Sequence, residues 1–227
     1  MNRAMNWRPG LERWCFLSDL EILTIALTFE QNNVMQADFA KPVVPKSRKK
    51  ILTYDDYAAL TPAGSGLYEL LNGKIIEMPS PTPAHQRVAR QLFKKMDAFV
   101  ELNQLGELFF APLDTVFDQT NTFQPDILFI SKSRSAIIEA KKIDGAPDLV
   151  VEILSDGNTA KEMSYKKYIY ESSGVLEYWI VNLLKQTVTV YNNIEGELLP
   201  SGIFSPSEKA ISQILPGFEL PVSDLFG

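Results

Sequence analysis

The stretch that decides the fold is Pro147-Asp148-Leu149-Val150-Val151-Glu152-Ile153-Leu154. Between and around its two acids it is apolar at consecutive positions, which is typical of a β-strand buried on both faces. Glu152 is an anomaly there, because an ionised carboxylate in an apolar interior costs several kcal/mol unless a positive group meets it. A second apolar run, residues 124–130, also contains one acid, Asp126. Two apolar strands, each with one misplaced acid, indicate a buried cation between them.

Strand geometry selects the partner of Glu152. Asp148 lies four residues away on the same strand, which corresponds to about 13 Å. Oxygen ligands lie about 2.0–2.6 Å from Mg²⁺ or Ca²⁺, so these two acids cannot easily share one ion. Adjacent strands are only about 5 Å apart, and we therefore expect Asp126 to pair with Glu152 and Asp148 to be a strand-edge residue. The alternative is that each acid is an edge-strand charge or meets a buried lysine or arginine without any metal.

The helix predicted at residues 160–172 offers a positive charge to the site. Glu162, Lys166 and Tyr170 are spaced i, i+4, i+8 and lie on one face, whereas Lys167 points about 100° away. Spacing alone leaves both lysines open as the cation. The alternative is a solvent-exposed Glu–Lys pair worth a few tenths of a kcal/mol.

Composition excludes several kinds of site. The 227-residue chain has one cysteine, Cys15, and one histidine, His85, which excludes an intrachain disulfide and zinc sites built on several cysteines or histidines. Oxygen ligands remain as metal donors, and these favour Mg²⁺, Mn²⁺ or Ca²⁺. The net charge of −6 gives no general attraction to nucleic acid, so local positive charge would have to bind it.

Residues 1–50 are predicted to be an N-terminal extension and linker, and residues 51–227 a folded domain. The first 34 residues differ in character from the rest, which suggests Met35 as an alternative start of the protein. The apolar stretch 14–29 carries Asp19 and Glu21, so we do not expect it to span a membrane. It also lacks the pattern of a signal peptide, and a cytoplasmic location is expected.

The predicted elements give a mixed α/β sheet flanked by helices. They are a helix that starts at Thr53, hairpin strands 67–71 and 74–78, helix 84–103, strands 107–117, 123–130 and 148–154, helix 160–172, and strands 175–181 and 187–191. Asn72-Gly73 between the hairpin strands is typical of a type I′ turn. Residues 131–146 are interpreted as a charged connection, and the segment after residue 191 as a short strand or helix followed by an irregular tail.

The chain resembles the PD-(D/E)XK nuclease superfamily, whose core is a helix, a three-strand meander, a second helix and one or two further strands. More closely, it is similar to a small bacterial restriction-endonuclease-like family that is abundant in cyanobacteria and was formerly a domain of unknown function. The resemblance covers residues 53–191 and extends towards residue 225. Its most specific part is residues 147–181, which end in Gly174-Val175-Leu176-Glu177-Tyr178-Trp179-Ile180-Val181. Tyr68-Glu69-Leu70-Leu71-Asn72-Gly73 and His85 also match the family.

The resemblance implies a set of site residues. Asp126 and Glu152 would hold one or two divalent metals, Mg²⁺ or Mn²⁺, with help from a main-chain carbonyl near Ile153. The superfamily has a lysine where this chain has Leu154. In the closer family that lysine lies on the next helix, four residues before a tyrosine, which favours Lys166.

Glu69 and His85 are supporting catalytic candidates. At the start of a helix, His85 would contact a phosphate or carry a proton. The alternative is that His85 is a surface or packing residue without a catalytic role.

The function implied is that of a metal-dependent endonuclease, a hydrolase that cleaves phosphodiester bonds of nucleic acid, with DNA as the expected substrate. A homodimer fits this function, because cutting both strands often uses two sites. The alternative is a catalytically inactive nuclease-fold module that binds nucleic acid or protein.

Overall fold

The computed structural model describes residues 50–61, 67–154 and 158–226. Residues 1–49, which include Met35 and nearly all of the predicted N-terminal extension, lie outside the described residues. Within the described part, the predicted fold class is confirmed, because mixed sheets are flanked by helices. No helix in this part is long and apolar enough to cross a membrane.

The central sheet has six strands and contains the strand from which the sequence analysis began. In sheet order they are β11 (Glu197–Phe204), β10 (Thr187–Ile194), β9 (Glu177–Asn182), β8 (Leu149–Leu154), β6 (Ile127–Ser131) and β3 (Gly106–Phe110). Strands β8 and β9 are parallel and the other pairs are antiparallel. Strand β8 thus has neighbours on both sides, as its continuous apolar sequence predicts.

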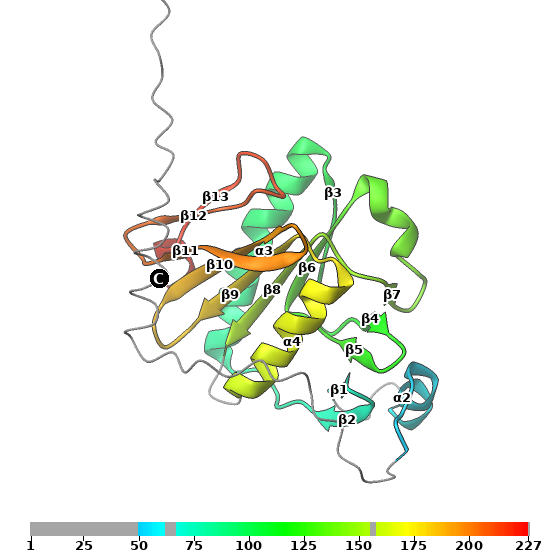
Figure 1. Cartoon of the computed structure of the whole chain (residues 1–227). Coiled ribbons are helices and arrows are strands. Elements are labelled where there is room, and N and C mark those ends of the chain that lie inside the picture. The colour runs from blue at the N-terminus through cyan, green and yellow to red at the C-terminus, as the bar shows by residue number, and fades with distance from the viewer. Residues whose placement is uncertain (1–49, 62–66, 155–157, 227) are drawn as a thin grey trace, which may run out of the picture. The chain divides into compact units, whose positions relative to one another are not determined.

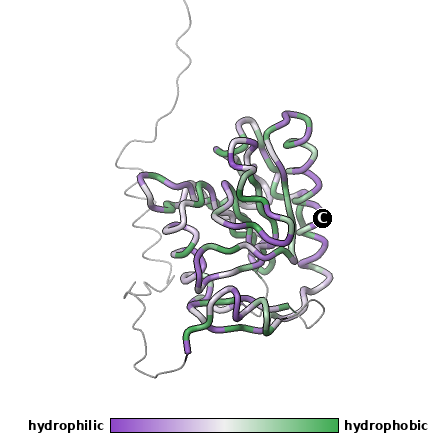
Figure 2. The backbone as a smooth tube through the Cα atoms, turned by 90° about the vertical axis from the view of Figure 1, so that its right-hand side faces the viewer, coloured by the Kyte–Doolittle hydropathy of each residue, from purple (hydrophilic) through white to green (hydrophobic). Residues whose placement is uncertain are grey.

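Helices cover both faces of this sheet: α3 (Pro83–Asn103) lies behind it and α4 (Ala160–Ser173) in front of it in the view of Figure 1. The α3 helix buries one stripe of side chains, Val88, Leu92, Met96 and Val100, against the sheet. Hydrophobic and hydrophilic residues accordingly alternate along it (Figure 2). Successive residues of β8 point to opposite faces, so Val151 packs in the cluster with α3, and Val150 in the cluster with α4.

A second sheet of five strands carries the predicted hairpin. In sheet order its strands are β2 (Lys74–Glu77), β1 (Tyr68–Leu71), β5 (Asn121–Phe123), β4 (Thr115–Asp118) and β7 (Ile143–Asp144). The turn residues Asn72 and Gly73 have φ angles of 49° and 68°, the positive values that a type I′ turn requires. The chain enters through α2 (Tyr54–Leu60), where Thr53 and Asp56 form the reciprocal hydrogen bonds of a capping box.

Two of the predicted strands are each divided between the two sheets. The run 107–117 forms β3 and β4, and the run 123–130 forms β5 and β6. Pro112 and Pro125 lie in the two breaks. Proline has no backbone N–H to donate to a strand ladder, so it ends a strand within a sheet. The second break places Asp126 immediately before β6.

The segments predicted to be irregular are more ordered than expected. Residues 131–146 contain the 3₁₀ helix η1 (Lys132–Ile137) and β7, and the C-terminal part contains β11, β12 (Lys209–Ile211), β13 (Glu219–Pro221) and α5 (Ser223–Phe226). The buried Glu177 side chain holds the C-terminal part, because its carboxylate accepts hydrogen bonds from Ser212 Oγ at 2.7 Å and from the backbone N–H of Gln213 at 2.6 Å. Glu177 therefore fixes the tail to the central sheet.

Candidate metal centre

Asp126, immediately before β6, lies beside Glu152 on the neighbouring strand β8. The register of β6 and β8 pairs Ile127 with Val151, and its continuation by one residue places Asp126 opposite Glu152. Residues opposed in this way share a face and have Cβ atoms about 4.5–5.5 Å apart. The backbone N–H of Ile153 donates a hydrogen bond of 2.7 Å to Asp126 Oδ2, which fixes the aspartate beside β8. The structure thus brings together the two acids that strand geometry selected.

Asp148 lies at the other end of β8 and has different partners. Its carboxylate accepts hydrogen bonds from the backbone N–H of Ser131 at 2.8 Å and from Arg134 Nη1 at 3.3 Å. It is buried. Asp148 is therefore a structural residue at the start of the strand, as the spacing argument predicted.

The α4 helix brings Lys166 to the carboxylates. Its Nζ lies 3.1 Å from Glu152 Oε1 and 2.8 Å from Glu69 Oε1, and the residue is only 1% exposed. The neighbouring Lys167 points away from this cluster and pairs with Glu171 at 3.2 Å. The structure therefore places Lys166, and not Lys167, beside the two glutamates.

Tyr170 is part of the same cluster, one helical turn after Lys166. Its hydroxyl donates a hydrogen bond to Glu152 Oε1, and the whole residue is buried. From the sequence this tyrosine served only as a marker for the lysine. Its spacing of four residues from Lys166 was the available signal that both side chains reach one place.

Glu69 reaches the cluster from β1, in the second sheet. Its Oε1 accepts hydrogen bonds from Lys166 and from the backbone N–H of Gln124, the latter at 2.9 Å. Lys166 thus connects a carboxylate of the five-stranded sheet with one of the six-stranded sheet. Among the described residues, the buried Oε2 of Glu69 has no hydrogen-bond partner.

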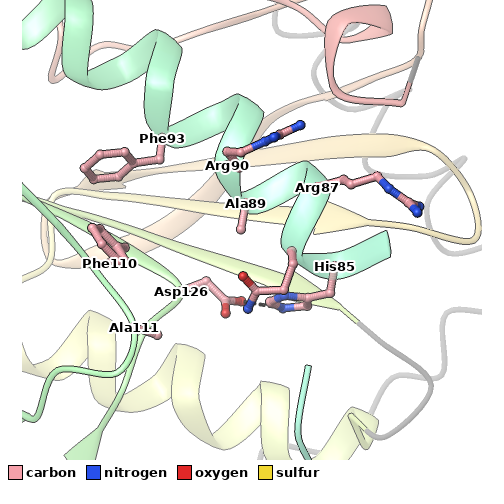
Figure 3. A pocket seen from close by; sticks show the side chains of 9 residues that line it. His85, Arg87, Ala89, Arg90, Phe93, Phe110, Ala111 and Asp126 are labelled. Atoms are coloured by element: carbon pink, nitrogen blue, oxygen red, sulfur yellow. Dashed lines mark hydrogen bonds and ion pairs between the residues drawn. The ribbon is translucent and has the colours of Figure 1, made fainter. Parts of the chain in front are cut away.

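His85 joins the cluster from the first turn of α3. Thr82 caps this helix by accepting a hydrogen bond from the backbone N–H of His85. The imidazole is buried and its Nε2 lies 3.2 Å from Asp126 Oδ2; Figure 3 shows the two side chains in contact. All five residues predicted from the sequence therefore lie together, at a cavity of about 150 Å³ that each of them lines.

Burial and charge shift the proton affinities of these groups. Burial raises the pKa of Glu152 to about 7, against the opposing effect of Lys166. Burial lowers the pKa of Lys166, but the charges of Glu152 and Glu69 outweigh it and the net shift is upward. For His85 too, burial lowers the pKa, and the hydrogen bond and charge of Asp126 reverse the shift and raise it.

The donor set has the chemistry that a divalent metal of the Mg²⁺ type requires. The carboxylates of Glu69 and Glu152 share Lys166, and that of Asp126 pairs with His85, so negative groups outnumber positive ones even when His85 is protonated. The hydrogen bonds described above use Oδ2 of Asp126 and Oε1 of Glu152. A cation would be held by these two carboxylates.

The described residues contain no group of three or more His, Cys, Asp or Glu side chains arranged to hold a metal ion. Mg²⁺ is commonly held by only one or two carboxylates, with water and substrate phosphate oxygens completing the shell. Asp126 and Glu152 fit this mode of binding. They do not fit a site in which protein side chains supply every ligand.

Comparisons with known proteins agree with this fold. The structure is similar to that of a protein described as "a putative nuclease belonging to DUF820" from Anabaena variabilis, with a TM-score of 0.66, 24% sequence identity, and coverage of 77% of this chain and 97% of that one. A search of curated proteins found no match. The family model Uma2, described as "Putative restriction endonuclease", matches residues 54–223, which include all five site residues. The chain belongs to this family.

Proposed function

We propose that this protein is a divalent-metal-dependent endonuclease that hydrolyses phosphodiester bonds of DNA, with Mg²⁺ or Mn²⁺ held by Asp126 and Glu152. The observation that carries the proposal is the placement of these two carboxylates opposite each other at a cavity, with Lys166 hydrogen-bonded to one of them. The chain belongs to a family described as "Putative restriction endonuclease", and this supports the same activity.

A metal bound at such a site lowers the pKa of a bound water and stabilises negative charge on the scissile phosphate. The protein groups have complementary tasks. Lys166 holds Glu152 and Glu69 in place and, where it lines the cavity, stabilises charge that develops on the phosphate or orients the attacking water. The Ile153 N–H orients Asp126.

His85 is suited to contact a phosphate oxygen or to carry a proton. Its Nε2 lies beside Asp126 Oδ2, whose hydrogen bond and charge raise the pKa of the ring against the effect of burial and so favour the protonated form. The buried Nδ1 has no hydrogen-bond partner among the described residues.

The direct test is cleavage of supercoiled plasmid and of single-stranded DNA by the purified full chain with Mg²⁺ or Mn²⁺. The variants are Asp126→Asn and Glu152→Gln, which preserve side-chain size and remove one charge each. We expect both to reduce the cleavage rate roughly 100-fold or more, because they weaken the electrostatic stabilisation of the transition state. Glu107→Gln is the matched control, since Glu107 is exposed on β3, opposite Ile130 and near the far end of the sheet.

One observation favours a second candidate, a nuclease-fold module without catalysis. Glu152 is already neutralised by Lys166 and hydrogen-bonded by Tyr170, so its burial is compensated without a metal. Titration calorimetry with Mn²⁺ separates the two. Absence of cleavage together with absence of Mn²⁺ binding would establish the inactive module, and equal cleavage by wild type and Glu152→Gln would remove this site from the reaction.

A further inference from the structure

A second cavity, of about 510 Å³, lies directly beside the carboxylate cluster. The two cavities share His85 and Asp126 in their walls. The remaining lining includes Arg87, Arg90, Phe93 and Phe110. In Figure 3 the two phenylalanines lie together at one end and the His85–Asp126 pair at the other, with both arginines extending from α3. An aromatic and cationic surface thus adjoins the proposed catalytic carboxylates.

Phe110 is held at the edge of this cavity with much of its ring in solvent. It is the last residue of the edge strand β3 and is 62% exposed. Its ring packs against the edge of Phe93, with centroids 4.9 Å apart and planes at 74°. The next backbone N–H, that of Ala111, donates a hydrogen bond of 3.1 Å to the carbonyl of Asp126. The exposed ring is therefore fixed close to the site by the strand that carries it.

Positive charge lines the α3 side of the cavity. Arg87 and Arg90 line the cavity, and with Lys94, which lies outside it, they are exposed and spaced i, i+3, i+7 on one face of the helix. Within the described residues neither arginine has an ion-pair partner, and α3 carries no acid before Asp97. This is the local positive charge that a chain of net charge −6 needs in order to bind nucleic acid.

We infer that this cavity binds an unpaired stretch of the DNA strand, with one base stacked on Phe110 and neighbouring phosphates held by Arg87 and Arg90. The inference rests on the proposed nuclease function and adds the strand state of the substrate. An exposed aromatic ring can stack only on a base whose face is free, and bases within a duplex already stack on their neighbours. Arginine on the adjacent helix face supplies the phosphate contacts. The bound strand passes from this cavity into the carboxylate cluster.

The test is fluorescence anisotropy with a short fluorescein-labelled single-stranded DNA of mixed sequence, and with its duplex, in EDTA so that no cleavage occurs. We expect the full chain to prefer the single strand. Phe110→Ala should weaken single-strand binding roughly 5- to 160-fold, the range for loss of one stacked base, and leave duplex binding nearly unchanged. The matched control is Leu102→Ala, which removes another exposed apolar side chain from the far end of α3.

The arginines give a second, independent measurement. Arg87→Gln and Arg90→Gln should each lower the slope of log affinity against log salt by about 0.7, the value for one phosphate contact on a single strand. Lys132→Gln is the charge-matched control, because Lys132 follows β6 at the end opposite Asp126. The five residues of β6 lie between the two positions, and the six residue steps correspond to about 20 Å.

The outcomes distinguish this inference from the proposed function. Tighter binding of the duplex than of the single strand, or equal single-strand affinity of wild type and Phe110→Ala, would overturn the inference even if the wild type cleaves DNA. Selective loss of single-strand binding in Phe110→Ala would support the inference even if no cleavage is found. In that case only the proposed nuclease activity would be rejected.

Discussion

Removal of the Lys166 ammonium should destabilise the domain far more than removal of its neighbour in the sequence. Lys166 is 1% exposed and is the cation shared by Glu69 and Glu152. The change we consider is Lys166→Met, which keeps a long unbranched side chain and deletes the charge. It leaves two buried carboxylates without their positive partner.

The expected cost follows from that burial. Breaking a buried ion pair by removal of one partner typically costs about 3–5 kcal/mol. A domain of this kind is stable by about 5–15 kcal/mol in total, so the loss is a large fraction of its stability. For 150–250 residues each kcal/mol corresponds to about 2–4 °C, which gives a decrease in Tm of roughly 6–20 °C.

The assay is urea unfolding followed by far-UV circular dichroism and by tryptophan fluorescence, to which the fully buried Trp179 contributes. Lys167→Met is the matched control at the adjacent position. Its ammonium pairs with Glu171 at 3.2 Å in a partly exposed i, i+4 arrangement, and such pairs contribute about 0.3–0.5 kcal/mol. We therefore expect the two neighbouring substitutions to differ about tenfold in their effect on the free energy of unfolding.

The pH dependence of the stability difference between wild type and Lys166→Met tests this reasoning. As the pH falls, the Glu152 carboxyl takes up a proton and no longer needs the lysine, so the difference between wild type and Lys166→Met should shrink. Equal costs for Lys166→Met and Lys167→Met, or a cost independent of pH, would contradict the reasoning that Lys166 serves to compensate buried carboxylates.

Three further outcomes are expected. Burial raises the pKa of Glu152 to about 7. Because a cation competes with the proton for this carboxylate, Mn²⁺ binding measured by calorimetry should strengthen as the pH rises through that value. Mn²⁺ affinity that does not change with pH would exclude Glu152 as a ligand. Asp126 raises the pKa of His85 against the effect of burial, so an NMR titration of this single histidine should give a value above about 6.5 in the wild type and a lower one in Asp126→Asn. This raised pKa stabilises the fold at pH values below the unfolded pKa, and the stabilisation disappears as the pH rises through the folded value. Glu177→Gln should cost roughly 1.5–3 kcal/mol in urea unfolding, since it removes a buried charged acceptor of hydrogen bonds from Trp179 and Ser212, and an unchanged midpoint would contradict that role.

The parts of the fold that the sequence predicts are those that local chemistry decides. The Asn72-Gly73 turn has the positive φ angles that this dipeptide favours, and Thr53 caps its helix as its position predicts. Strand β8 lies inside the central sheet because its apolar side chains follow one another on both faces. Each of these features depends on residues close together in the chain.

The division of the strands between two sheets depends on contacts distant in sequence. An apolar run such as 107–117 has the same pattern whether it stays in one sheet or passes to another. Pro112 and Pro125 were local signals for the two breaks, but a proline does not specify which strand the chain joins next. The partners of β3 and β4 are decided by tertiary packing, so only their existence could be predicted.

The site residues also divide into those that local geometry predicts and those that depend on tertiary packing. Strand geometry was sufficient to select Asp126 over Asp148. Four residues along a strand put Asp148 about 13 Å from Glu152, whereas an adjacent strand is only about 5 Å away. The choice between Lys166 and Lys167 depends on how α4 is rotated about its axis relative to the sheet, which no spacing within the helix defines. Phe110 could not be recognised either, since its exposure follows from the position of β3 at the sheet edge.

The charge balance of the cluster bears on whether Lys166 alone explains the buried Glu152. A purely structural network gains most when its charges cancel and every polar atom has a partner. Here Glu69 and Glu152 share one lysine, Asp126 pairs with His85, and among the described residues the buried Glu69 Oε2 lacks a hydrogen-bond partner. Burial raises the pKa of Glu152 to about 7 even though Lys166 opposes the shift, so the lysine does not offset the whole cost of burying this carboxylate. Lys166 thus compensates only part of the negative charge of its two glutamates, and this remaining negative charge is the physical argument for proposing a metal beside Lys166 and not in place of it.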